Sequence, residues 1–180
     1  QQQQDVLAQF RLTFADLKSI VAERQAGRSQ LGSSAEQVVA RLNPIEQDLR
    51  QSGDIQAYAS LVAVNQKVQQ ARFELRGYTF TGRAEFEQPA LAAIDQAIEV
   101  LQALPAQLPA RFASDLSAGA QALGDYRNAV LRFSKARQDS ERALQQLSEL
   151  DTKLLDLSDE LTEFQAARVA TEATRANTLL

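Results

Sequence analysis

The chain has 180 residues, 44% of them hydrophobic, and a net charge of −4, which suits one domain or two small ones that share helices. It contains no His and no Cys, which excludes a thiol nucleophile, an imidazole base, a disulfide and a metal site built from these residues. No basic block stands out, so the composition argues against nucleic acid as a partner.

The composition favours long helices. Seven Gly and four Pro leave little material for loops, and Leu, Ala, Gln, Glu and Arg dominate the sequence. No run of eighteen apolar residues exists, so the sequence as given predicts no membrane span, and it also lacks the apolar core of a signal peptide. Of the nineteen cations, fifteen are Arg, the residue whose planar guanidinium fits a carboxylate.

The first element we expect is one long helix over 5–52. Apolar residues recur there at alternating spacings of three and four, and this register continues across Gly32. An alternative divides the segment at Gly32, because Ser34 with Gln37 fits a capping box for a fresh helix. The unbroken register favours the single helix, with a possible bend at Pro44.

Two shorter helices follow. Gly53 suits a left-handed helix end and Asp54 suits an N-cap, so the second helix is expected over 54–81. The third is expected over 84–104, with the apolar residues of its inner face recurring at helical spacing.

The last element is a second long helix, expected from about 110 to 175 after a connector that contains Pro105 and Pro109. Two mostly apolar heptad rows run along it without a Pro. Its longest polar gap is 134–142.

The order long, short, short, long predicts an all-α fold, an elongated up-down-up-down four-helix bundle with long first and last helices. An arrangement as two stacked helical modules stays open. Both chain ends would then lie at the same pole. We expect one domain over 1–180, with a possible module junction near 24–28 and 134–142.

Polar residues interrupt the row of positions on the second helix that is predicted to face the core, which we call its core seam. Asn65, Arg72 and Thr79 recur there one heptad apart, and Arg76 lies one turn beyond Arg72. Cations partly withdrawn from water need a partner, and an outside carboxylate could supply it through bidentate hydrogen bonds.

Counting residues from the shared turns places other polar side chains at the same height as Arg72. The predicted carboxylate pocket contains Arg72, Arg76, Tyr126, Arg127 and Ser34, with Tyr78 and Thr79 a turn or two below. The alternative is that these Arg side chains reach solvent and pair with carboxylates such as Glu74 or Glu141.

A second group of cations, Arg24, Arg28 and Arg137, interrupts the seams of the two long helices. It predicts either a second ligand site or an interface with a second subunit, and a solvated polar patch is the alternative.

Carboxylates near the end, such as Asp156 and Glu160, have the spacing of an exposed helix face and not of a general acid–base pair. We therefore expect no enzyme activity, no catalytic residue, no metal and no cofactor.

Two segments resemble a known family. QQARFELRGYTFTG at 69–82 and DYRNAVLRF at 125–133 are similar to segments of the periplasmic ligand-binding domains of bacterial methyl-accepting chemotaxis receptors, specifically the helical bimodular sensors. The closing ATRANTLL at 173–180 resembles the lead-in to the second membrane span of such receptors.

The resemblance implies a periplasmic domain of an inner-membrane protein, tethered by flanking spans, that forms a homodimer. Its ligands would be small organic acids such as malate, succinate, citrate or acetate, held by Arg72, Arg76 and Tyr126, and it would signal by small helix shifts. Bimodular sensors usually have six helices, however, and this sequence predicts four or five. An N-terminal module is therefore missing, or the domain is a simple four-helix sensor.

Two other functions stay open from the sequence. One is a structural coiled-coil adaptor without a small ligand, and the other is the ectodomain of a sensor histidine kinase.

Overall fold

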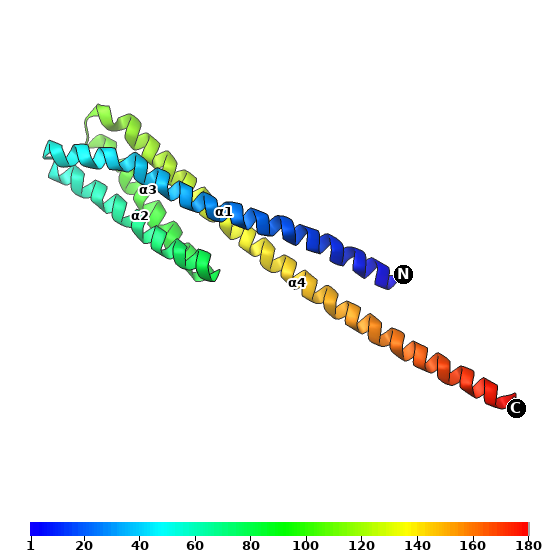
Figure 1. The fold of residues 1–180 in the computed structure, drawn as a ribbon. Coiled ribbons are helices and arrows are strands. Elements are labelled where there is room, and N and C mark those ends of the chain that lie inside the picture. The colour runs from blue at the N-terminus through cyan, green and yellow to red at the C-terminus, as the bar shows by residue number, and fades with distance from the viewer. Residues whose placement is uncertain (180) are drawn as a thin grey trace. The chain divides into compact units, whose positions relative to one another are not determined.

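The computed structural model describes residues 1–179, and nearly all of them are helical, which confirms the all-α prediction (Figure 1). The last residue of the predicted closing segment, Leu180, lies outside the described residues. The helices are α1 (Gln2–Ser52), α2 (Ile55–Thr81), α3 (Glu87–Ala103) and α4 (Ala113–Thr178). Short 3-10 turns lie at Ala84–Phe86, Leu104–Ala106 and Ala110–Phe112.

Helix α1 continues through both Gly32 and Pro44. The alternative that starts a new helix at Ser34 is therefore wrong. Leu31 and Ala35, on either side of Gly32, are buried in the same core, so tertiary packing holds one helical register across the glycine.

The ends of α2 follow from local chemistry, as predicted. Gly53 has φ 79° before the helix, and the Asp54 side chain accepts a hydrogen bond from the backbone N–H of Ala57 at 3.1 Å. At the other end Gly82 has φ 70°, and its N–H donates to the carbonyl of Tyr78 at 2.7 Å.

The described residues divide into two compact units. The core unit comprises 22–138, and the terminal unit comprises 1–21 with 139–180. The single domain over 1–180 stays a prediction. Among residues 1–179, no helix combines the length and hydropathy that crossing a membrane requires.

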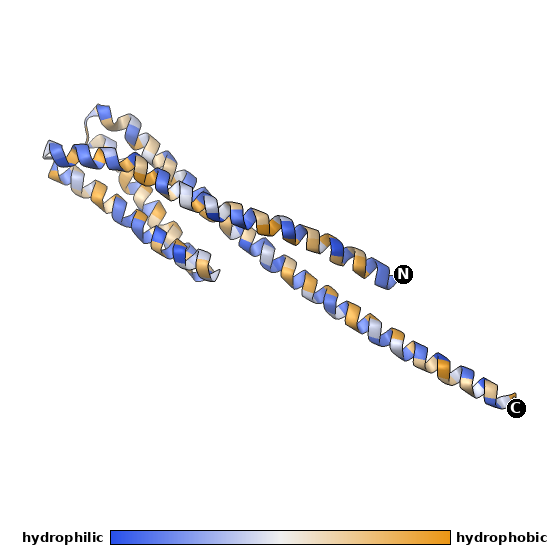
Figure 2. Cartoon of the chain, in the orientation of Figure 1, coloured by the Kyte–Doolittle hydropathy of each residue, from blue (hydrophilic) through white to orange (hydrophobic). Residues whose placement is uncertain are grey.

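In the core unit, the second part of α1, the whole of α2 and α3, and the first part of α4 form a four-helix bundle (Figure 1). Hydrophobic and hydrophilic residues are interspersed along each helix (Figure 2), as expected where only one side of a helix faces a core. The helices approach closely: a Cβ added at Gly119 of α4 would lie 2.9 Å from Leu42 of α1 and 3.3 Å from Leu101 of α3. Large, fully buried side chains such as Tyr78, Tyr126 and Phe133 fill the centre.

The buried face of α2 differs from the prediction by one position. Val64, Ala71 and Tyr78 are fully buried, whereas the neighbouring positions held by Asn65, Arg72 and Thr79 are only half-buried. The prediction that these polar residues occupy the core seam is therefore wrong, because small and aromatic residues fill it. Arg72 and Thr79 lie at the rim of the core, where side chains reach both interior and solvent.

The terminal unit is open by comparison. Among its described residues only Ser140, Ala143 and Leu150 are buried. Apolar side chains of its two helical segments remain exposed, including Phe14 at 51% and Phe164 at 67%. Two helical segments alone do not cover their own apolar faces.

Candidate functional site

A pocket of about 210 Å³ lies within the core unit, where α1, α2 and α4 meet. Its lining comprises Arg28, Leu31, Gly32 and Ala35 of α1, Arg72, Leu75, Arg76 and Thr79 of α2, and Tyr126 of α4. The pocket therefore draws on three helices and not on a single helix surface.

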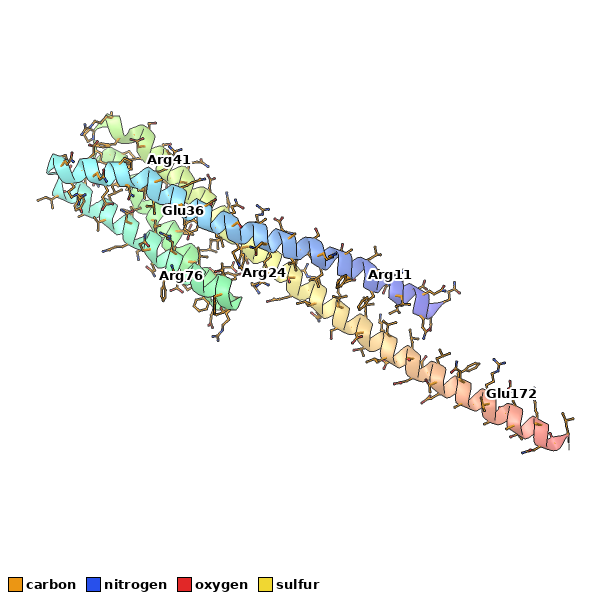
Figure 3. The ribbon with its side chains drawn as sticks, viewed as in Figure 1. Arg11, Arg24, Glu36, Arg41, Arg76 and Glu172 are labelled. Atoms are coloured by element: carbon orange, nitrogen blue, oxygen red, sulfur yellow. The ribbon has the colours of Figure 1, made fainter. Side chains whose placement is uncertain are left out.

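The rim of this pocket is cationic. Three of its lining residues, Arg28, Arg72 and Arg76, are Arg, and the lining contains no Asp or Glu. Arg72 is half-buried, whereas Arg28 and Arg76 are exposed (Figure 3 labels Arg76 on α2). Three guanidinium groups around one small space repel one another, and a bound anion would relieve that repulsion.

Neither Arg72 nor Arg76 forms an ion pair within residues 1–179. The alternative prediction is therefore met in one respect, since Arg76 is exposed to solvent, but neither Arg pairs with Glu74 or Glu141. The guanidinium groups keep their hydrogen-bonding capacity for another partner.

Arg28 reaches from α1 to the carboxyl end of α2, where its Nη2 donates to the carbonyl oxygen of Thr79 at 3.1 Å. The last carbonyl groups of a helix lack intrahelical partners and carry the negative end of its dipole, so a cation is favoured there. The Thr79 hydroxyl donates to the carbonyl of Arg76 at 3.2 Å, which leaves its oxygen free to accept a bond.

Tyr126 is the aromatic wall of the pocket. Its removal from water raises the pKa of its hydroxyl to about 12, and the positive charge of Arg72 opposes that rise. The phenol is therefore protonated at neutral pH and can donate a hydrogen bond. Among residues 1–179 no protein group bonds to this hydroxyl, so a ligand can take that position.

The inner side of the pocket is apolar. Leu31, Ala35 and Leu75 are buried at its floor, and Gly32 adds bare helix backbone. A cationic rim over an apolar floor suits a molecule with a short carbon skeleton and at least one carboxylate.

The pocket contains four residues of the predicted set, namely Arg72, Arg76, Thr79 and Tyr126. It also contains Arg28, which the sequence had placed in a second group. The sequence signal for Arg28 was its spacing: it lies seven residues before Ala35, on the same heptad row of the same helix. Gly32 was missed because a residue without a side chain offers no chemical signal.

Three predicted residues lie outside the pocket. Ser34 is buried on α1 and is not among the lining residues, although its neighbour Ala35 is. Arg127 instead donates from Nε to Asp95 of α3 at 2.8 Å. Tyr78 lies in the core one residue from Thr79, with its hydroxyl engaged in another network.

That network joins α2, α3 and α4. The Tyr78 hydroxyl accepts a hydrogen bond from Nε of Arg137 at 2.8 Å and donates to Oε2 of Glu87 at 3.1 Å. The Ser134 hydroxyl donates to the same carboxylate oxygen at 2.7 Å. We refer to these four residues as the Tyr78 network. Arg137 thus fixes the packing between helices at the position where a second ligand site was predicted.

Arg24, the remaining member of the second group, lies near the carboxyl end of α2 (Figure 3 labels it on α1). Its guanidinium carbon is 5.8 Å from the ring centroid of Phe133, within reach of a cation–π interaction. Within residues 1–179 its buried Nε has no hydrogen-bond partner. Of Arg24, Arg28 and Arg137, only Arg28 lines the pocket between α1, α2 and α4, and a second ligand site or an interface at this group stays a prediction.

The sequence was compared with known proteins. The family model of the helical bimodular sensor domain matches residues 1–176. "Methyl-accepting chemotaxis protein McpQ" of Pseudomonas putida is 41% identical over 180 residues, which is 100% of this chain and 28% of that protein. "Methyl-accepting chemotaxis protein McpK" of Pseudomonas aeruginosa is 29% identical over 133 residues, 69% of this chain and 21% of that protein.

The chain thus spans under a third of the length of both relatives. The family model, in contrast, matches nearly the full sequence, and the all-helical structure agrees with it. The chain belongs to the helical bimodular sensor domain family.

Proposed function

We propose that this chain is the extracytoplasmic sensor domain of a chemoreceptor and that it binds small organic acids of two to six carbons in the pocket between α1, α2 and α4. The observation that carries the proposal is the set of three Arg side chains around a space whose lining contains no carboxylate. The names of the two relatives support the chemoreceptor part.

The lining chemistry favours a carboxylate over a neutral ligand. Arg can hold a carboxylate by two parallel hydrogen bonds, and hydrogen bonds between charged groups are roughly twice as strong as neutral ones. The protonated Tyr126 hydroxyl adds another donor, and Leu31 and Leu75 contact the carbon skeleton. A neutral ligand would leave three like charges uncompensated.

The pocket volume favours a small ligand. At about 210 Å³ it lies below the ~300 Å³ at which pockets for drug-sized molecules begin. Acetate, malate, succinate and citrate span the range of sizes to be tested.

The position of the pocket suits a sensor. Because the pocket lining comes from three helices, a ligand that prefers one arrangement of these helices shifts the population toward it. Shifts of about 1–2 Å between packed helices are a known mode of transmission. We place the receptor in the inner membrane as a homodimer, with this domain in the periplasm.

Isothermal titration calorimetry with the four acids tests the proposal. We expect at least one acid to bind, and Arg72→Ala to weaken it about 10-fold or more, since hydrogen bonds to charged groups contribute ~1.5–3 kcal/mol each. The matched control is Arg41→Ala, an exposed Arg of α1 outside the pocket, which should bind as the wild type does.

A thermal melt separates the sensor from the structural adaptor. A ligand that binds only the folded state raises Tm, whereas an adaptor without a ligand site would melt at the same temperature in every acid. Silence across the panel, or equal affinity in Arg72→Ala and wild type, would contradict the proposal.

A further inference from the structure

The glycines of this chain differ in how much room surrounds them. Four have a local reason to lack a side chain: Gly53 and Gly82 have positive φ, and a Cβ would meet other atoms at 2.8 Å at Gly77 and 2.9 Å at Gly119. At Gly27 the nearest atom would lie at 3.5 Å, an ordinary contact.

Gly32 and Gly124 have no such reason. Each lies within a long helix, and a Cβ added at either would have no neighbouring heavy atom within 4 Å. Glycine in a helix interior is destabilising relative to Ala, so both positions carry an unfavourable residue that packing does not require.

Gly32 and Gly124 differ in the residues that surround them. Gly32 lines the pocket, directly after Leu31 of its floor and one turn beyond Arg28 of its rim. Gly124 does not line this pocket. Gly32 is exposed and lines the pocket, so the open space beside it borders the volume in which a ligand would lie.

We propose that Gly32 is a specificity-determining residue that sets the size of the acid accepted by the pocket. The missing side chain makes room for the carbon skeleton of the ligand against α1, while Arg28, Arg72 and Arg76 hold its carboxylates. This inference rests on the proposed function, since it names the determinant of size at the same site.

The physical argument is steric. A methyl group at position 32 would meet no heavy atom of the protein within 4 Å, so the fold should tolerate it. If the open space belongs to the ligand, as we propose, the methyl group reduces the volume left for the acid. A Leu side chain would occupy a large part of a 210 Å³ space. Larger acids should lose affinity before smaller ones do.

Two pairs of variants test the inference. Gly32→Ala and Gly32→Leu place a small and a large side chain in the pocket, and Gly124→Ala and Gly124→Leu make the same changes in a helix outside it. Thermal melts should show all four to be at least as stable as the wild type, because each replaces a helix-interior glycine.

Calorimetry with acetate and citrate then measures the size dependence. We expect Gly32→Ala to weaken citrate at least 10-fold more than acetate and Gly32→Leu to abolish binding of both. Both Gly124 variants should retain wild-type affinities.

The outcomes are distinguishable. Wild-type protein that binds no acid would overturn the proposed function and this inference with it. Wild-type binding with an unchanged Gly32→Leu variant, or an equal loss of acetate and citrate affinity in Gly32→Ala, would overturn this inference alone. A Gly32→Ala variant that melts far below Gly124→Ala would also overturn it, because the space would then not be free.

Discussion

The core unit and the terminal unit share the same two long helices and the same heptad rows, yet only the core unit buries its apolar side chains. On α1, Val38 and Ile45 are sealed in the core unit, whereas Phe10 and Leu17 on the same row are half-buried in the terminal unit. A heptad pattern thus predicts a helix, but it does not say how many neighbours cover that helix.

The difference also explains where the ligand pocket lies. In the core unit the neighbouring helices close the centre and leave a polar row of α2 at its rim, so cations can line a defined space. Two pockets of the terminal unit contain carboxylates beside their one cation, Lys153: Glu149 lines one of them, and Asp5 and Asp156 line the other. Selective binding of an anion is favoured by the first arrangement, because there several cations face one space without a carboxylate among them.

The largest effect that we expect from the difference between the two units is on stability, when one Leu of α1 is replaced in each unit. Leu42→Ala removes a side chain with 0% exposure and should lower the free energy of unfolding by about 2–5 kcal/mol. Leu12→Ala removes one with 68% exposure and should lower it by about 0.5 kcal/mol or less. Urea denaturation measures both, and equal losses would show that the terminal unit is packed as tightly as the core unit.

A second effect is the pH dependence of the free energy of unfolding that the Tyr126 hydroxyl causes. Its pKa of about 12 in the folded state exceeds the usual value near 10, so between these pH values the folded state keeps a proton that the unfolded state releases. Stability should therefore fall as pH rises from 10 to 12, by up to roughly 2–3 kcal/mol.

Tyr126→Phe has no phenol to titrate and should lose less stability over this window. Denaturation of the wild type and the variant at pH 9 and pH 12 measures the difference. Parallel losses in the two proteins would contradict the burial of this hydroxyl in the core unit.

A smaller effect is expected from the Tyr78 network. Tyr78→Phe removes the hydroxyl that joins Arg137 to Glu87 and should lower the free energy of unfolding by about 1–3 kcal/mol, because buried polar groups lose a partner. Tyr58→Phe is the matched control, since Tyr58 is only partly buried at the other end of α2, and it should change stability by less than ~0.5 kcal/mol. Comparable losses would argue against a cooperative network.

Most of the fold could be predicted because its signals are local. Gly53 with Asp54, and Gly82, fix the ends of α2 through backbone conformation and capping, which depend on a few adjacent residues. The inward face of α2 could not be fixed in the same way. Ala71 belongs to the sealed row although Ala has a weak apolar signal, and its burial follows from the approach of neighbouring helices.

The candidate site was predictable to the extent that its chemistry repeats along a helix. Arg72, Arg76 and Thr79 lie on one side of α2, and their spacing predicts that they come together. The sequence did not fix which residues of α1 lie level with Arg72. Counting residues from the turns assumes that the connections between helices have equal lengths. That count reached Ser34, whereas the residues of α1 that line the pocket are Arg28, Leu31, Gly32 and Ala35.

The central claim is that a small carboxylate binds in the core unit and not on the open surfaces of the terminal unit. The most direct measurement is an NMR titration of labelled protein with succinate, followed through the side-chain Nε–H signals of the Arg residues and the backbone amides. We predict saturable shifts at Arg28, Arg72 and Arg76 and at the amides around Gly32 and Tyr126. Shifts confined to 1–21 and 139–180, with these signals unchanged, would contradict the account.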